Sequence, residues 1–240
     1  MNIGLLCEGP SDLPAITHFV GDQLRKLGVE PQFRSLFPEP DKTRGAGGWS
    51  NLLLWLNNNP AATRIARYFS GGLFGGDAAY EPLNAILIHM DADVVDDPGF
   101  QNFIRDNYNL SVEESDLPAQ RGQIVAEVLK SACQFELMTD RDRRSHVTAV
   151  AVESTETWCL AVFHNQPSDF ESLRDTSLTN AFMRVLEASE SRSPQASYEN
   201  CDKDIRRREM FCRRYATFSD RIKASCPHFS DMVDQLGRLA

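Results

Sequence analysis

The chain has 240 residues, and its 25 Lys and Arg against 34 Asp and Glu give a formal net charge of -9 at pH 7. Apolar residues make up 42% of the sequence, which excludes a wholly disordered chain and allows a large packed core. The acidic balance excludes a basic coat for nucleic acid over the whole surface, although it permits a local basic groove.

The residues after Met1 lack the basic and apolar regions of a signal peptide, and no apolar run is long enough to span a bilayer. The six cysteines are scattered without a Cys-x-x-Cys pair, a pattern that favours reduced thiols over disulfides or a zinc site. We therefore expect a cytoplasmic protein with no membrane segment.

The first strand is expected over residues 2–7, where a short apolar run ends at Glu8-Gly9-Pro10-Ser11-Asp12. Gly and Pro turn the chain there, and apolar residues at helical spacing then continue to Gly28. Glu8 is thus placed at the carboxyl end of the strand. Asp12 is placed in the first helical turn, where the helix dipole favours an anion.

The second strand is expected over residues 31–37, and the loop after it carries Lys42, Arg44 and three glycines. A basic, glycine-rich loop can approach a phosphate backbone closely, which makes Lys42 and Arg44 candidate nucleic-acid ligands. A plain surface loop is the alternative. Further helices are predicted over residues 49–56, 61–69, 98–106 and 119–135, and residues 140–144 are predicted to be a solvated loop of mixed charge.

The third strand is indicated by an apolar run over residues 85–88 that ends in His89-Met90-Asp91-Ala92-Asp93. A buried parallel strand delivers such residues to its carboxyl end, where an open α/β sheet has its ligand crevice. Asp91 and Asp93 project to the same side if the strand continues, and both can still point into the crevice if it breaks. Two carboxylates this close favour a hard divalent cation, whereas an Asp-rich turn is the simpler alternative.

A fourth strand is predicted over residues 146–152, and it too is followed by acid, at Glu153 and Glu156. If the strands are parallel, these side chains converge with Glu8, Asp91 and Asp93, and together they could bind one or two Mg²⁺ or Mn²⁺ ions. Glu156 also lies in the first turn of the next helix, where a capping-box carboxylate is the alternative interpretation.

From about residue 168 the pattern becomes all-helical, with helices predicted over residues 178–187, 202–215 and 222–239, the last with a break at Pro227. The second of these holds the densest basic tract of the chain, and Lys203, Arg206 and Arg207 share one of its faces. They are candidates for binding a nucleic-acid backbone through its phosphates. A solvated helix, with Asp202, Asp204 and Glu209 as ion-pair partners, is the alternative.

Two of these stretches resemble the motifs of the TOPRIM superfamily. Leu5-Leu6-Cys7-Glu8-Gly9-Pro10-Ser11-Asp12 resembles its first motif, and Leu87-Ile88-His89-Met90-Asp91-Ala92-Asp93 resembles its second, a strand that ends in Asp-x-Asp. The superfamily includes topoisomerases, bacterial primases and OLD-type nucleases. The resemblance implies that Glu8, Asp91 and Asp93 act with Mg²⁺ on phosphodiester bonds.

Later residues resemble an uncharacterised bacterial TOPRIM-like family that is related to phage-defence components. The resemblance lies in the Glu-x-x-Glu-x-Trp-x-Leu-Ala pattern that starts at Glu153 and in the Cys-Pro-x-Phe segment that starts at Cys226. The chain departs from the longer Asp-x-Asp motif, because Val94 stands where Gly is common. No catalytic lysine or tyrosine nucleophile can be placed, so covalent strand transfer is unsupported.

We therefore expect an α/β fold, with a TOPRIM-like, mainly parallel four-stranded sheet over residues 1–167 and a helical extension over residues 168–240. The expected function is a Mg²⁺-dependent nuclease. One alternative is an inactive TOPRIM-like subunit that binds nucleic acid beside a partner ATPase or effector, since the chain has no Walker motif. A phosphohydrolase with an Asp nucleophile is another, although Asp-x-Asp on the third strand disfavours it.

Overall fold

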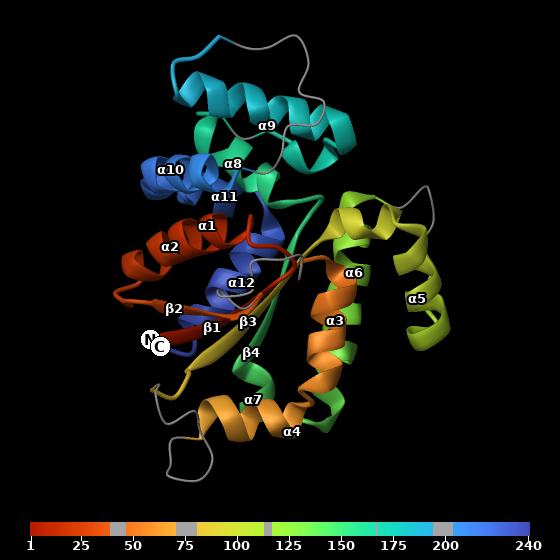
Figure 1. Ribbon diagram of the computed structural model, residues 1–240. Helices are drawn as coiled ribbons and strands as arrows, with labels where there is room; N and C mark the ends of the chain where they lie inside the picture. The colour runs from red at the N-terminus through yellow and green to blue at the C-terminus, as the bar shows by residue number, and fades with distance from the viewer. Residues whose placement is uncertain (39–46, 71–80, 113–116, 167, 194–203) are drawn as a thin grey trace.

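The computed structural model describes residues 1–38, 47–70, 81–112, 117–166, 168–193 and 204–240. These residues contain one sheet whose strands are all parallel and lie in the order β2-β1-β3-β4. The strands are β1 (Asn2–Cys7), β2 (Gln32–Phe37), β3 (Ala85–Asp91) and β4 (His146–Ala151). The prediction of a mainly parallel four-stranded sheet flanked by helices is confirmed (Figure 1).

The register aligns the carboxyl ends of the three strands β1, β3 and β4. Cys7 pairs with His89, and Asp91 pairs with Ala151. Every residue of β3 is buried, as expected for a central parallel strand that is covered on both faces. This coverage explains why the sequence of β3 is a nearly continuous apolar run.

Helices cover both faces of the sheet, as Figure 1 shows. One apolar cluster joins β1 and β4 to the helices on the first face, and a second cluster joins β3 to those on the other face. On the first face lie α1 (Leu13–Ala15), the π-helical turn η1 (Ile16–Val20), α2 (Gly21–Lys26), α8 (Thr155–Phe163) and α12 (Pro227–Gly237). On the other face lie α3 (Trp49–Asn58), α5 (Pro98–Tyr108) and α6 (Pro118–Ala132).

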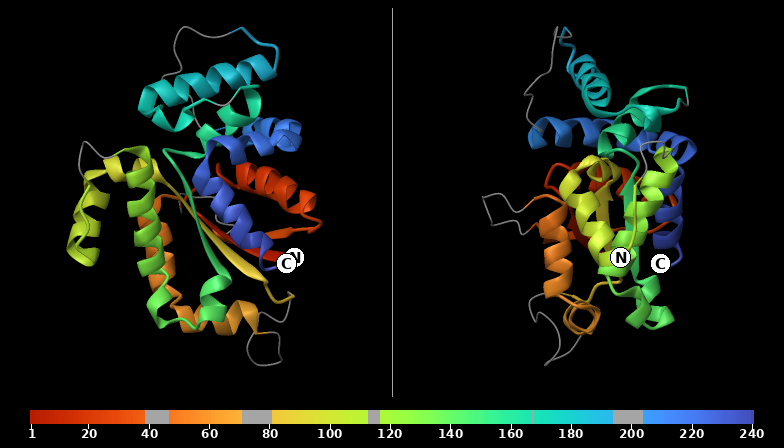
Figure 2. Two further views of the ribbon diagram at one scale, coloured as in Figure 1. Left: turned by 180° about the vertical axis from the view of Figure 1, so that it is seen from behind. Right: turned by 90° about the vertical axis from the view of Figure 1, so that its right-hand side faces the viewer.

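Most of the C-terminal helices pack around α8, whereas α12 packs on β4, and they share the apolar cluster of the first face (Figures 1 and 2). Phe211 and Phe229 are fully or almost fully buried in that cluster, together with β1 and β4 side chains. The described residues after 167 therefore pack on those before it through one continuous core. The additional helices are α9 (Asp175–Ser189), α10 (Ile205–Tyr215), α11 (Asp220–Ser225), η5 (Phe170–Ser172) and η6 (Ala216–Phe218).

The amino-terminal edge of the sheet is bordered by α4 (Ala61–Arg64), which continues as the π-helical turn η2 (Ile65–Phe69), and by α7 (Asp140–Arg144). The prediction of a loop over residues 140–144 is therefore wrong. The hydroxyl of Thr139 accepts a hydrogen bond from the backbone N–H of Asp142 at 3.2 Å and caps this short helix.

The cysteines of the described residues, Cys7, Cys133, Cys159, Cys212 and Cys226, are all buried and form no disulfide. Within the same part of the chain, no helix is long and apolar enough to cross a membrane.

Candidate functional site

Acidic residues follow three neighbouring strands at the carboxyl edge of the sheet. Glu8 comes directly after β1, Asp91 is the last residue of β3, and Glu153 lies two residues beyond β4. Because the strands are parallel, these three positions lie along one edge. The backbone N–H of Gly48 donates to the carbonyl oxygen of Glu8 at 2.8 Å, which places the start of α3 beside this turn.

Asp91 is only 4% exposed. The Nε2 atom of the fully buried His89 lies 3.6 Å from its carboxylate, and the imidazole packs edge-on against Trp158 with ring centroids 5.6 Å apart. On β1, burial raises the pKa of the Cys7 thiol, and the nearby charges of Asp12 and Asp91 raise it further. Cys7 is therefore a protonated core thiol and not a nucleophile.

Asp93 does not continue the strand. β3 ends at Asp91, and the 3-10 turn η3 (Ala92–Asp96) follows, so Asp93 leaves the pleat and its side chain is exposed. Its backbone N–H donates to the carbonyl oxygen of Glu153 at 2.9 Å. This bond ties the end of β3 to the residues after β4, and it holds Asp91 and Asp93 in different environments.

Glu153 is 1% exposed and has a left-handed backbone with φ of 62°. Its carboxylate lies 3.2 Å from Nε of Arg121 and 3.5 Å from Nε of Arg174. Arg121 also donates to both carboxylate oxygens of Asp96, at 3.0 and 2.6 Å. Burial raises the pKa of Glu153 to about 7, although both arginines act to lower it. The arrangement supplies the counter-charge of Glu153 from within the chain.

The negative charge of Glu156 is also compensated by an arginine of the same chain. Its buried carboxylate forms an ion pair with Arg208 of α10, and Arg208 also donates to the hydroxyl of Thr155 at 3.0 Å. Thr155 in turn donates to Asp12 at 3.2 Å, and Asp12 accepts the backbone N–H of Gly9 at 3.0 Å. A continuous chain of polar contacts thus joins α10 to the turn that carries Glu8.

Three arginines of this edge were missed by the sequence analysis: Arg121, Arg174 and Arg208. A signal existed for two of them. Arg121 precedes Val125 by four residues and stands on the buried stripe of α6, whereas Arg208 precedes Phe211 and Cys212 on the buried stripe of α10. A charged residue on a core-facing stripe indicates a buried ion pair, because burying an unpaired charge is too costly.

The basic residues that were predicted to bind nucleic acid differ in their surroundings. Lys42, Arg44 and Lys203 lie outside the described residues. Arg206 is exposed on α10, whereas Arg207 donates to both carboxylate oxygens of Glu190 at 2.9 and 2.8 Å. Of the ion-pair partners considered for this helix, Asp204 caps its first turn and Glu209 pairs with His18.

We tested the site for a divalent cation by the chemistry of its donors. The side chains of Glu8, Asp91 and Asp93 offer the carboxylate oxygens that Mg²⁺ and Mn²⁺ prefer. Glu153 and Glu156 are held by arginines, which supply the positive charge that an ion would bring. Among the residues that the structure describes, no group of three or more His, Cys, Asp or Glu is close enough to hold a metal ion. The donor chemistry of Glu8, Asp91 and Asp93 thus suits an ion, but the structure does not gather these three side chains around one point, and Glu153 and Glu156 are already paired with arginines.

Comparisons of the chain with family models, with curated proteins and with solved structures gave no match. The class of protein is therefore defined by its fold and its site alone. Its described residues form a parallel α/β fold with four strands, and carboxylates and buried arginines lie along the carboxyl edge of the sheet.

Glu171 of η5 is expected to make the stability of the folded protein depend on pH. It contacts the Cys226 thiol, and burial raises its pKa from 4.5 to about 7. Because the folded pKa exceeds the unfolded one, the folded state binds the extra proton, and stability falls as the pH rises between about 4.5 and 7. We expect Glu171→Gln to reduce this fall and to be more stable than the native chain at pH 8.

Urea unfolding of both proteins at pH 5 and pH 8 measures the effect of Glu171→Gln. The change is expected to be partial, since Glu153 titrates in the same range. Glu127→Gln, at an exposed position of α6, is the matched control and should keep the native pH profile. An unchanged pH dependence in Glu171→Gln would contradict the assignment.

Proposed function

We propose that the carboxyl edge binds Mg²⁺ or Mn²⁺ and hydrolyses phosphodiester bonds of nucleic acid. The observation that carries the proposal is the alignment of Glu8 with Asp91. Glu8 directly follows β1 and Asp91 ends β3, the two central strands, and the pairing of Cys7 with His89 sets these strand ends side by side. This is the place where open α/β sheets bind their ligands.

In this proposal Asp91 and Asp93 bind the ion, and Glu8 either completes its ligands or accepts the proton of the attacking water. A bound divalent ion would polarise the phosphate and lower the pKa of a bound water. Arg121 and Arg208 hold the acidic residues beyond β4 in place through Glu153 and Glu156, and so position the edge without touching the substrate.

The nucleic-acid backbone would contact exposed cations beside the edge. Arg206 and Arg213 of α10 are exposed, and an exposed guanidinium can pair with phosphate at little cost. Lys42, Arg44 and Lys203 are proposed for the same task. Arg207 would have to exchange Glu190 for phosphate, so we expect Arg206 to contribute more than Arg207.

Calorimetric titration with Mg²⁺ and Mn²⁺ tests the metal site. The native chain should bind, and Asp91→Asn or Glu8→Gln should weaken binding by about tenfold or more, because each removes one charged oxygen ligand. Glu127→Gln removes an exposed carboxylate of α6 and should bind as the native chain does. Circular dichroism of each variant confirms that it is folded.

Nuclease assays on single- and double-stranded DNA and RNA then follow with the same four proteins. Cleavage by the native chain and by Glu127→Gln, but not by Asp91→Asn, is the expected result. If the native chain binds no divalent ion at millimolar concentration, even with nucleic acid present, the catalytic proposal is rejected.

The second candidate is a subunit that binds nucleic acid without cleaving it and works beside a partner ATPase or effector, as in phage-defence systems. The arginine pairing of Glu153 and Glu156 favours it, because it removes two carboxylates from any metal site. Nucleic-acid binding that depends on Arg206, without cleavage in Mg²⁺ or Mn²⁺, would support this candidate over the nuclease.

A further inference from the structure

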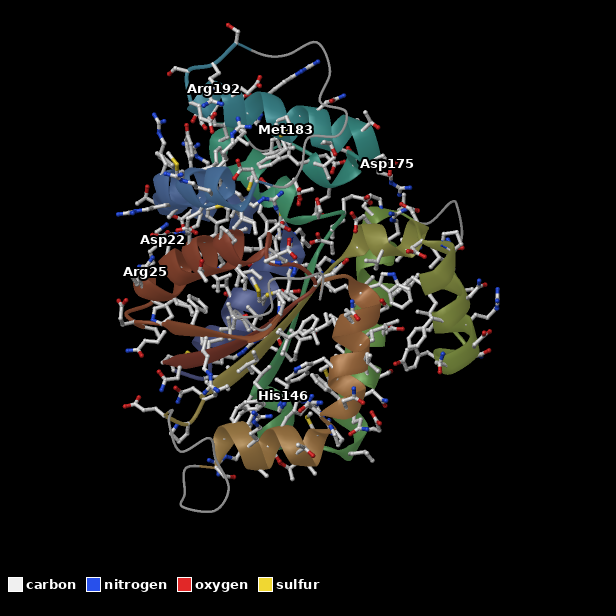
Figure 3. All side chains as sticks on the ribbon, in the orientation of Figure 1. Asp22, Arg25, His146, Asp175, Met183 and Arg192 are labelled. Carbon is white, nitrogen blue, oxygen red and sulfur yellow. The ribbon has the colours of Figure 1, made fainter. Side chains whose placement is uncertain are left out.

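A cavity of about 920 Å³ lies at the amino-terminal edge of the sheet, the edge opposite to Glu8 and Asp91. It is formed where η2, the start of β3, α7 and the end of α12 meet. Its lining includes Phe69, Leu83, Asn84, Arg141, Arg144 and Arg238. Figure 3 labels His146, the first residue of β4, at this end of the molecule.

The charged side chains that line this cavity are mostly basic, whereas the whole chain is acidic. Arg141, Arg144 and Arg238 are exposed, and none of the three forms an ion pair with an acid among the described residues. Asp142 is the acidic member of the described lining, and its carboxylate already accepts the hydroxyl of Thr139 at 2.6 Å. In a protein of net charge -9, three guanidinium groups around one cavity attract an anion.

The cavity also has an apolar wall and a neighbouring compartment. Phe69 and Leu83 contribute apolar surface beside the arginines. A second cavity of about 490 Å³ shares Arg144 and Gln235 with the first and adds the cations Lys130 and Arg143 and the acid Asp231. Arg144 therefore lines both cavities.

We propose that this cavity binds a nucleoside polyphosphate. Guanidinium groups pair with phosphate oxygens through two parallel hydrogen bonds, so three of them suit a polyphosphate chain. The wall of Phe69 and Leu83 suits the flat face of a base, and the volume is within the range of about 300–1,000 Å³ for small-molecule sites.

The test is calorimetric titration of the full chain with ATP and, separately, with inorganic triphosphate, both in EDTA. The chelator keeps divalent ions from the carboxyl edge, so the outcome does not depend on the proposed metal site. We expect ATP to bind, with Arg144→Glu and Arg238→Glu each weakening it by about tenfold or more. Arg184→Glu makes the same charge change at an exposed position of α9 and should stay within about twofold of the native chain.

Three results would overturn the proposal. They are no ATP binding by the native chain at millimolar concentration, an equal loss in Arg184→Glu and Arg144→Glu, and binding of a single-stranded oligonucleotide at these arginines without binding of ATP. Weaker binding of inorganic triphosphate than of ATP supports contact between the base and the apolar wall. Equal binding of the two would overturn that contact and reduce the site to a polyphosphate site.

Discussion

Replacing Arg208 by Met is expected to lower the free energy of unfolding by about 3–5 kcal/mol. Arg208 is 2% exposed, and its guanidinium binds both the carboxylate of Glu156 and the hydroxyl of Thr155. Met fills much of the same space but removes the positive charge that pairs with the buried carboxylate of Glu156. Urea unfolding of the variant and the native chain at pH 7 measures the loss.

Two controls separate this charge effect from packing. Arg206→Met, two residues away on the exposed side of α10, should change stability by no more than about 0.5 kcal/mol. The double variant Arg208→Met, Glu156→Gln should recover part of the loss, because the orphaned charge is removed as well. Equal losses in the single and double variants would show that the ion pair is not the source of stability.

Replacing Arg121 by Met is expected to have a comparable effect, about 3–5 kcal/mol at pH 8. Arg121 is 3% exposed and holds both Glu153 and Asp96. We expect a smaller loss at pH 5.5 than at pH 8. Burial already raises the pKa of Glu153 to about 7, and removing Arg121 raises it further, so acid neutralises the orphaned carboxylate.

Denaturant unfolding at the two pH values provides the measurement for Arg121→Met. Lys130→Met is the matched control, because Lys130 is exposed on the same helix and has no role in holding Glu153. Losses of the same size at pH 5.5 and pH 8 would mean that Arg121 acts through packing and not through the charge of Glu153.

The sheet could be predicted from the sequence because local signals carry it. The apolar runs that end at Cys7 and Asp91 have the length of buried strands, and helical patterns separate them, which is the signature of parallel pairing. The stretch over residues 140–144 was assigned wrongly, since its charges indicate solvent exposure whether it is loop or helix. Its helical state depends on the cap by Thr139 and on one turn of backbone bonds.

The site was only partly predictable, for a physical reason. The sequence places acidic residues after strands, and parallel pairing brings those strand ends to one edge. Which acids have counter-charges depends on contacts between residues far apart in the chain. Arg208 lies 52 residues from Glu156, and Arg121 lies 32 residues from Glu153. No periodicity within one helix reveals the partner of such an arginine.

The end of β3 at Asp91 is a second feature that the sequence could not predict. Alternation along a strand places Asp91 and Asp93 together only if the chain stays extended, whereas a 3-10 turn begins at Ala92. Single-residue changes of backbone direction depend on what the turn packs against. Here the turn is fixed by the bond between the N–H of Asp93 and the carbonyl of Glu153 on the neighbouring segment.

The shared core of residues 1–167 and 168–240 determines how this protein can be divided. A fragment that ended at residue 167 would uncover the face of the sheet beneath α12, with Trp158 losing the ring of Phe229, whose centroid lies 5.0 Å away. It would also lose Arg208, whose guanidinium forms an ion pair with the buried carboxylate of Glu156. The C-terminal helices are therefore not an exchangeable module. Truncated forms and domain swaps should keep them attached, and any exchange of segments would have to move Glu156 and Arg208 together.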